Sequence, residues 1–218
     1  MSLWELFIEG GWLIVALMLP ILICSVVALA IFIERVMVLR KMNVNTRSFI
    51  MQIQAMLRKG RISDAVLYCK RTPGPVAKIA KAGLERYKRP RNEVKEAIES
   101  SGKAEIYHLE RRLGILGTIA AIAPLFGFLG TVIGMMQAFS EIVARRGIVG
   151  PDVLAGGIWE ALSTTAFGLM VGIMAIIFHN WIQGKIESHV FDMQQSSVDL
   201  LDLLIDREAS ANGFSDES

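Results

Sequence analysis

Charged side chains are scarce in this chain of 218 residues, at 20% of the sequence, and they are unevenly distributed. Nineteen of the 23 lysines and arginines lie between Glu34 and Arg112, and long stretches on either side hold almost none. Soluble proteins carry about 25% charged residues, spread over their surfaces. The segregation excludes a water-soluble enzyme and a disordered tail.

Cysteine is also rare. Cys24 and Cys69 form no CxxC pair, so the sequence predicts neither a disulfide nor a metal site and excludes a secreted disulfide scaffold. The chain shows no catalytic nucleophile and no phosphate-binding loop. We therefore expect no enzymatic activity, no catalytic residue and no cofactor.

The sequence instead contains three long hydrophobic runs, at residues 12–33, 113–139 and 158–181. The first two contain no charge, and the third is apolar apart from Glu160, several hydroxyls and His179-Asn180 near its end. A helix rises about 1.5 Å per residue, so each run can cross a hydrocarbon core of roughly 30 Å. The sequence predicts an all-α integral membrane protein with three transmembrane helices.

The first run resembles a retained span more than a cleaved signal peptide. Residues 1–11 contain no lysine or arginine, whereas a signal peptide begins with a basic region. The run ends in Glu34-Arg35, where a signal peptide would have small residues.

Basic residues beside the spans predict their orientation, because cytoplasmic loops carry the excess of lysine and arginine. Four of them follow the first span and three precede the second: Arg35, Arg40, Lys41 and Arg47, then Lys103, Arg111 and Arg112. We expect a bacterial inner-membrane protein with cytoplasmic regions at 34–112 and 182–218, and periplasmic ones at 1–11 and 140–157. Arg145 and Arg146 in the outer connection count against this orientation but are outnumbered.

The region 34–112 reads as helices separated by breakers. The spacing predicts helices from Phe49 to Leu57, from Ser63 through Val66 and Leu67, from Val76 to Tyr87, and from Asn92 directly into the second span. The third span is expected to continue past the bilayer, and the last nine residues, from Ser210, to be disordered. We attribute the basic character of 34–112 to orientation and lipid contact, and not to nucleic-acid binding.

Small residues are concentrated in the second and third spans. Seven glycines lie in these two spans, and five of them are predicted to pack helices: Gly127, Gly130, Gly134, Gly168 and Gly172. Their spacing lets helix backbones approach closely in a membrane. The glycines can pack two helices of one subunit only, and we expect them to pack helices of neighbouring subunits as well.

Polar groups fall within the same spans: Thr131, Glu160, Thr164 and Thr165. An ionisable side chain in a span is costly and so tends to face an internal cavity or a partner. The alternative is that Glu160 lies at the outer interface, in contact with water. On an ideal helix Thr164 lies about 40° from Glu160 and Thr165 about 140°, so spacing alone pairs Glu160 with Thr164.

Several segments resemble the MotA/TolQ/ExbB proton-channel family, and its ExbB and TolQ branches above all. They are GFLGTVIGMM at 127–136, AGGIWEALSTTAFGL at 155–169, Glu34-Arg35 after the first span, and GPVAKIAKAGL at 74–84. Three spans also match this branch. The sequence departs from the family in having Met174 where a proline is frequent, and His179 where an aromatic residue is frequent.

The resemblance implies a homo-oligomer, a pentamer whose second and third spans surround a pore. It also implies an ExbD/TolR-type single-span partner, a TonB- or TolA-type protein as the load, and pore residues at Thr131, Glu160 and Thr165. Thr165 then replaces Thr164 as the residue that acts with Glu160.

The hypothesis is therefore a proton-channel subunit that converts proton motive force into mechanical work. A non-conducting oligomeric membrane scaffold is the alternative. The sequence leaves open which load is driven, and whether the ion is proton or sodium.

Overall fold

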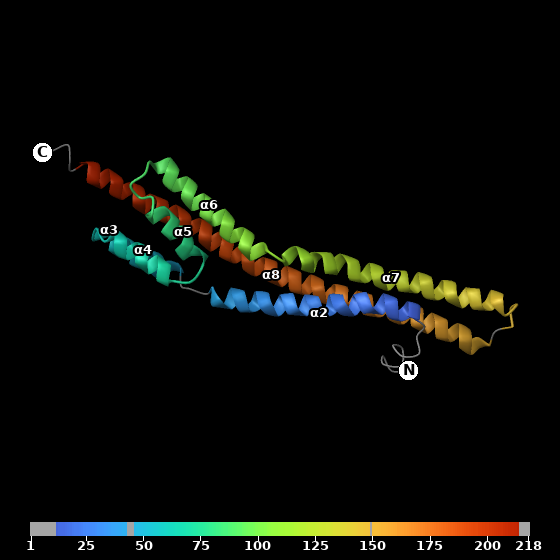
Figure 1. Ribbon diagram of the computed structural model, residues 1–218. Coiled ribbons are helices and arrows are strands. Elements are labelled where there is room, and N and C mark those ends of the chain that lie inside the picture. The colour runs from blue at the N-terminus through green and yellow to red at the C-terminus, as the bar shows by residue number, and fades with distance from the viewer. Residues whose placement is uncertain (1–11, 43–45, 149, 214–218) are drawn as a thin grey trace. The chain divides into compact units, whose positions relative to one another are not determined.

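The computed structural model describes residues 12–42, 46–148 and 150–213, and within these it contains helices and no strand (Figure 1). The predicted periplasmic segment 1–11 and residues 214–218 lie outside the described part. The helices are α2 (Trp12–Lys41), α3 (Thr46–Arg58), α4 (Ile62–Arg71), α5 (Pro75–Leu84), α6 (Arg91–Glu110), α7 (Leu113–Ala144) and α8 (Pro151–Gly213).

Three stretches of helix are long and apolar enough to cross a membrane: Val15–Arg40, Arg91–Ala144 and Val153–Leu204. The first covers residues 15–33 of the run predicted at 12–33, and the other two contain the runs 113–139 and 158–181 completely. The prediction of an all-α chain with three membrane-spanning helices is confirmed at this level for the described residues.

The chain divides into two compact units. The first, here called the spanning unit, comprises Met1–Glu34 and Arg112–Ile182, and so includes most of α2, all of α7 and the first half of α8. The second, the extension unit, comprises Arg35–Arg111 and Gln183–Ser218.

In the spanning unit α2 packs against α8 through aromatic rings. The ring of Phe32 stacks on that of Phe178 with 4.0 Å between centroids, and it meets Trp181 edge-on at 5.7 Å. Other apolar side chains of α2 point outward, among them Leu22 and Val26. An apolar surface of this kind suits hydrocarbon, because the helix satisfies its own backbone hydrogen bonds.

Helices α7 and α8 form a hairpin, and both helices continue into residues 140–157, the predicted outer connection. α7 continues to Ala144, where Arg145 pairs with Glu141 at 2.7 Å, and α8 already begins at Pro151. Gly147 takes a positive φ of 79° in the turn. Proline suits the first turn of a helix because its missing N–H would have no partner there, and so α8 starts early.

The extension unit has its own apolar core. Its largest fully enclosed side chains are Ile53 of α3, Leu84 of α5, Leu109 of α6, and Met193 and Leu200 of α8. A polar pair closes one side of this core, where the Lys78 ammonium lies 2.9 Å from both carboxylate oxygens of Glu105. The third span helix therefore continues as a core element of the extension unit, as predicted.

The helix predicted from Ser63 through Val66 and Leu67 is present as α4, which buries Ala65 and Cys69 and leaves Leu67 exposed. The predicted end of the next helix is wrong in detail. α5 ends at Leu84 and not at Tyr87, and a series of turns leads from it to α6.

The helix that begins near Asn92 does not run directly into the second span. α6 ends at Glu110, and Arg112 takes a left-handed φ of 70° before α7 begins at Leu113. The predicted disorder from Ser210 is also wrong for residues 210–213, since α8 continues to Gly213.

Candidate functional site

In the α7–α8 hairpin, Gly127 of α7 contacts Gly168 of α8 directly. A methyl group added at Gly168 would lie 2.6 Å from the carbonyl oxygen of Ala123 and 2.7 Å from the Cα atom of Gly127. One added at Gly127 would lie 3.1 Å from the Cα atom of Gly168. Since real methyl groups do not approach backbone so closely, only glycine permits this contact between helices.

The other three glycines receive side chains of the facing helix. Gly130 accommodates Thr164, Gly134 accommodates Ala161, and Gly172 accommodates the ring of Pro124. A methyl group at Gly134 would stand 2.8 Å from the Cβ atom of Ala161. All five predicted glycines thus pack the hairpin within one chain, and further packing between subunits remains a prediction.

A hydroxyl pair lies beside this glycine contact. Thr131 of α7 and Thr165 of α8 are hydrogen-bonded through their hydroxyl oxygens. The Thr165 hydroxyl also donates to the carbonyl oxygen of Gly127 at 2.8 Å, and the Thr131 hydroxyl lies 3.4 Å from the same oxygen. The structure therefore brings together two predicted pore residues, one from each helix of the hairpin.

Each hydroxyl has one proton and two lone pairs. If Thr165 donates to Gly127, Thr131 can donate to Thr165, and every donor in the cluster is satisfied. Lone pairs remain on both hydroxyl oxygens, so the pair can still accept a hydrogen bond from water or from a partner side chain. Such a neutral polar lining hydrates a passage without placing a fixed charge in it.

Thr164, the residue that spacing alone pairs with Glu160, occupies a different environment. It is 1% exposed, faces Gly130, and donates its hydroxyl proton to the Ala161 carbonyl of its own helix at 2.8 Å. Its polar group is therefore satisfied inside the hairpin. Thr165, one residue on, reaches across to α7 at the edge of the contact.

Glu160 is partly buried, one turn before Thr164 on α8. Within the described part of the chain no hydrogen bond or ion pair reaches its carboxylate. The enclosed residue Thr164 lies between Glu160 and Thr165 around the helix, so the carboxylate and the hydroxyl flank the packed face on opposite sides. The structure does not join Glu160 to the hydroxyl pair within one chain.

Two further polar residues have positions that spacing did not predict. The imidazole of His179 packs against Gly117, whose missing side chain leaves it room, with ring atoms 3.6 Å from where a methyl group would stand. Arg35 is buried and donates to the carbonyl oxygens of His108 and Leu109 at 3.3 and 3.4 Å. In the sequence, the only indication of a role for Arg35 is the Glu34-Arg35 pair at the end of the first span.

Three spanning helices, two of them in a glycine-packed hairpin with a hydroxyl pair at its edge, define a multi-pass membrane protein of all-α class. The model of the MotA/TolQ/ExbB proton channel family matches residues 71–195, which include α7 and the part of α8 up to residue 195. The chain belongs to this family, and to its ExbB/TolQ branch.

Named relatives agree with that placement. The biopolymer transport protein ExbB of Aquifex aeolicus is 36% identical over 51% of this chain and 74% of its own length. The Tol-Pal system protein TolQ of Haemophilus influenzae is 34% identical over 42% of this chain and 40% of its own. A protein of Methanothermobacter thermautotrophicus, named as an ExbB homologue, is 33% identical over 72% of this chain, which spans only 56% of that relative.

Proposed function

We propose that this chain is the pore-forming subunit of an ExbB/TolQ-type motor in the bacterial inner membrane. It converts proton motive force into mechanical work through a single-span partner of the ExbD/TolR type. Five copies form a ring in which α7 and α8 surround a lumen that holds the partner helices. Residues 12–33, 113–139 and 158–181 span the bilayer, with 1–11 and 140–157 in the periplasm and the other regions in the cytoplasm.

The observation that carries the proposal is the hydroxyl cluster of Thr131 and Thr165 on the Gly127 carbonyl. Many exposed side chains of the same hairpin are apolar, such as Leu125, Phe128 and Leu169. A polar cluster at the edge of an apolar helix pair suits a surface that faces water or a polar partner.

The proposed ion path uses both flanks of α8. Because Glu160 and Thr165 flank the packed face on opposite sides, a ring brings the carboxylate of one subunit toward the hairpin of the next. Glu160 and the two hydroxyls then form the polar path, and a carboxylate on the partner helix takes up and releases the proton. One charge moving through 100 mV supplies about 2.3 kcal/mol, so a few protons drive one conformational step.

The load follows from the two named branches, of which ExbB is a biopolymer transport protein and TolQ a Tol-Pal protein. We propose that the motor energises outer-membrane transport through a TonB-type protein, or envelope maintenance through a TolA-type protein. Sodium is the other ion that a hydroxyl-lined path accepts.

The second candidate function is a non-conducting oligomeric scaffold. The satisfied hydrogen bonds of the hydroxyl cluster favour it, because a purely packing role requires the same bonds. The two functions differ in what they need: a motor requires a single-span partner and a lumen.

The test is purification of the chain together with the products of neighbouring genes, followed by native mass spectrometry and flux measurement in liposomes. The motor predicts five copies of this chain with a smaller single-span protein, and potential-driven proton or sodium uptake. A ring without such a partner and without uptake supports the scaffold, and a monomer contradicts both.

A further inference from the structure

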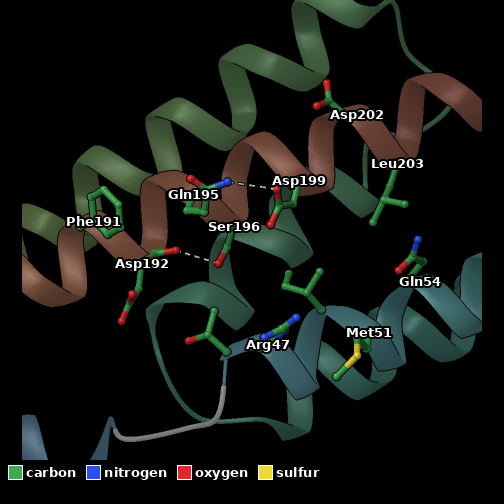
Figure 2. Close-up of a pocket in the computed structure, with 12 residues that line it drawn as sticks. Arg47, Met51, Gln54, Phe191, Asp192, Gln195, Ser196, Asp199, Asp202 and Leu203 are labelled. Carbon is green, nitrogen blue, oxygen red and sulfur yellow. Dashed lines mark hydrogen bonds between the residues drawn. The ribbon is translucent and has the colours of Figure 1, made fainter.

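An open groove lies in the extension unit between α3 and α8, with a volume of about 590 Å³. Figure 2 shows Asp192, Asp199 and Asp202 on the α8 side and Arg47 and Met51 on the α3 side. Three carboxylates against one guanidinium leave the groove a net charge of −2 at neutral pH. Its apolar side chains are Ile50, Met51, Phe191 and Leu203.

Among the described residues no lysine or arginine lies within ion-pair distance of Asp192, Asp199 or Asp202. The side-chain amide of Gln195 donates a hydrogen bond to the Asp199 carboxylate at 3.3 Å. Phe191 is 66% exposed beside them. The groove therefore combines unpaired negative charge with exposed apolar surface, which is typical of a protein-binding surface.

A segment of opposite charge lies elsewhere in the same unit, in the turn between α5 and α6. Residues 85–91 contain four basic residues and one acid, Glu85, whose carboxylate lies 3.7 Å from Lys81. The four basic residues are exposed, and none has a carboxylate within ion-pair distance in the described part of the chain: Arg86, Lys88, Arg89 and Arg91. This segment is called the basic turn below.

The basic turn and the groove lie at the same height along α8. A methyl group added at Gly83, just before the turn, would stand 3.4 Å from Leu200, which lies between Asp199 and Asp202 in the sequence. In a ring whose axis runs along the helices, neighbouring copies are related by rotation only. The turn of one copy is then level with the acidic groove of the next.

The two surfaces also lie on different sides of the unit. α3 packs on α4, α4 on α5, and α5 on α6, so the groove beside α3 and the turn that precedes α6 are at opposite ends of this series. A contact between two different surfaces is heterologous, and repeated heterologous contacts close into a ring when the rotation permits. An isologous dimer would instead need one self-complementary patch.

We propose that the α3–α8 groove is the docking site for the basic turn of a second copy of this chain. Arg86 and Arg89 of one copy pair with Asp199 and Asp202 of its neighbour, so that the extension units join in the same ring as the spans. The inference rests on the proposed ring, and it adds an electrostatic contact outside the membrane that sets the direction of assembly.

The first test is charge exchange, read by native mass spectrometry of the full chain with its partner in detergent. We expect the pair Asp199→Lys with Asp202→Lys, and the pair Arg86→Glu with Arg89→Glu, each to weaken the ring by roughly tenfold in dissociation constant. Combining all four substitutions restores it. Glu187→Lys and Lys185→Glu, both on α8 outside the groove, are the matched controls.

The second test does not depend on charge reversal. Asp202→Cys and Arg89→Cys are placed in separate, differently tagged copies that also carry Cys24→Ala and Cys69→Ala, and the co-expressed copies are treated with a short bis-maleimide. Cross-linking in the mixture, at several times the yield of either variant alone, supports the proposal. A stable ring that neither cross-links nor responds to charge exchange overturns this contact alone, whereas a wild-type chain that forms no ring overturns the proposed function.

Discussion

The Thr165 hydroxyl of α8 donates a hydrogen bond to the Gly127 carbonyl oxygen of α7, over 2.8 Å. Gly127 is also the glycine whose backbone meets Gly168. The bond and the backbone contact therefore depend on each other, because α8 approaches closely enough for Thr165 to reach the carbonyl only where both helices lack side chains. Packing and polar lining are parts of one local structure.

Replacing Thr165 tests how much its hydroxyl contributes to stability and to ion flux. Thr165→Val keeps the shape and removes the donor, and we expect it to lower the stability of the purified protein by about 0.6–2 kcal/mol and to reduce ion flux. Thr165→Ser keeps the hydroxyl and should retain most of both. Thermal unfolding in detergent and flux in liposomes are the measurements, and equal behaviour of the two variants would contradict a role for the hydroxyl.

The glycine contact predicts that two glycine-to-alanine substitutions in α8 change the stability of the protein in opposite directions. Gly168→Ala places a methyl group against the α7 backbone and should cost about 1–3 kcal/mol. Gly184→Ala meets no atom within 4 Å and should stabilise the helix by up to about 1 kcal/mol. Thermal unfolding of both variants measures these changes. If Gly168→Ala leaves the stability unchanged, the hairpin is packed less closely than described.

Arg35 is expected to stabilise the end of α6. Its guanidinium donates to the carbonyls of His108 and Leu109, which have no helical partner because α6 ends at Glu110. Arg35→Met should therefore cost about 1–3 kcal/mol of stability, whereas Arg40→Met, at an exposed position, should be nearly neutral. Unfolding by heat in detergent, with α-helical circular dichroism as the signal, distinguishes them.

Cys69 should be unreactive in the folded protein. Burial raises the pKa of its thiol from 9.0 to about 12, so the reactive thiolate is rare at neutral pH. A Cys24→Ala variant should label with maleimide slowly at pH 8 when folded and rapidly when denatured. Fast labelling of the folded chain would contradict the burial of this thiol.

The same shift gives a pH dependence. Below about pH 9 the thiol is protonated in both the folded and the unfolded chain, and its burial costs no ionisation energy. Between pH 9 and about 12 the unfolded chain loses this proton while the folded chain keeps it, so stability falls as pH rises. In the Cys24→Ala background, Cys69→Ala should remove that part of the decline, measured as unfolding temperature against pH.

Much of this fold follows from patterns that act locally. The charge-free runs at 12–33 and 113–139 predict their helices because nothing else satisfies a backbone in hydrocarbon. Gly60, with φ of 76°, follows the end of α3, and Gly74, with φ of 117°, comes directly before α5; both lie between predicted helices, and glycine adopts these angles without strain.

The features that residue spacing did not predict depend on contacts between residues far apart in the sequence. Arg112 breaks the helix without a glycine or proline, and it pairs with Glu34 across 78 positions of sequence. The placement of Thr164 inside the hairpin and Thr165 at its edge depends on where Gly130 and Gly127 lie on the facing helix. The angle from Glu160 alone favoured Thr164, since it contains no information about α7.

Potential-driven proton uptake through the reconstituted complex tests the central claim most directly. Liposomes containing the chain and its single-span partner receive a potassium diffusion potential, and the initial rate of internal acidification is compared between wild type, Glu160→Gln and the control Glu141→Gln, whose position at the end of α7 is exposed. The account predicts uptake by wild type and Glu141→Gln, and a fall to the rate of protein-free liposomes in Glu160→Gln. Uptake by Glu160→Gln at the wild-type rate would contradict it.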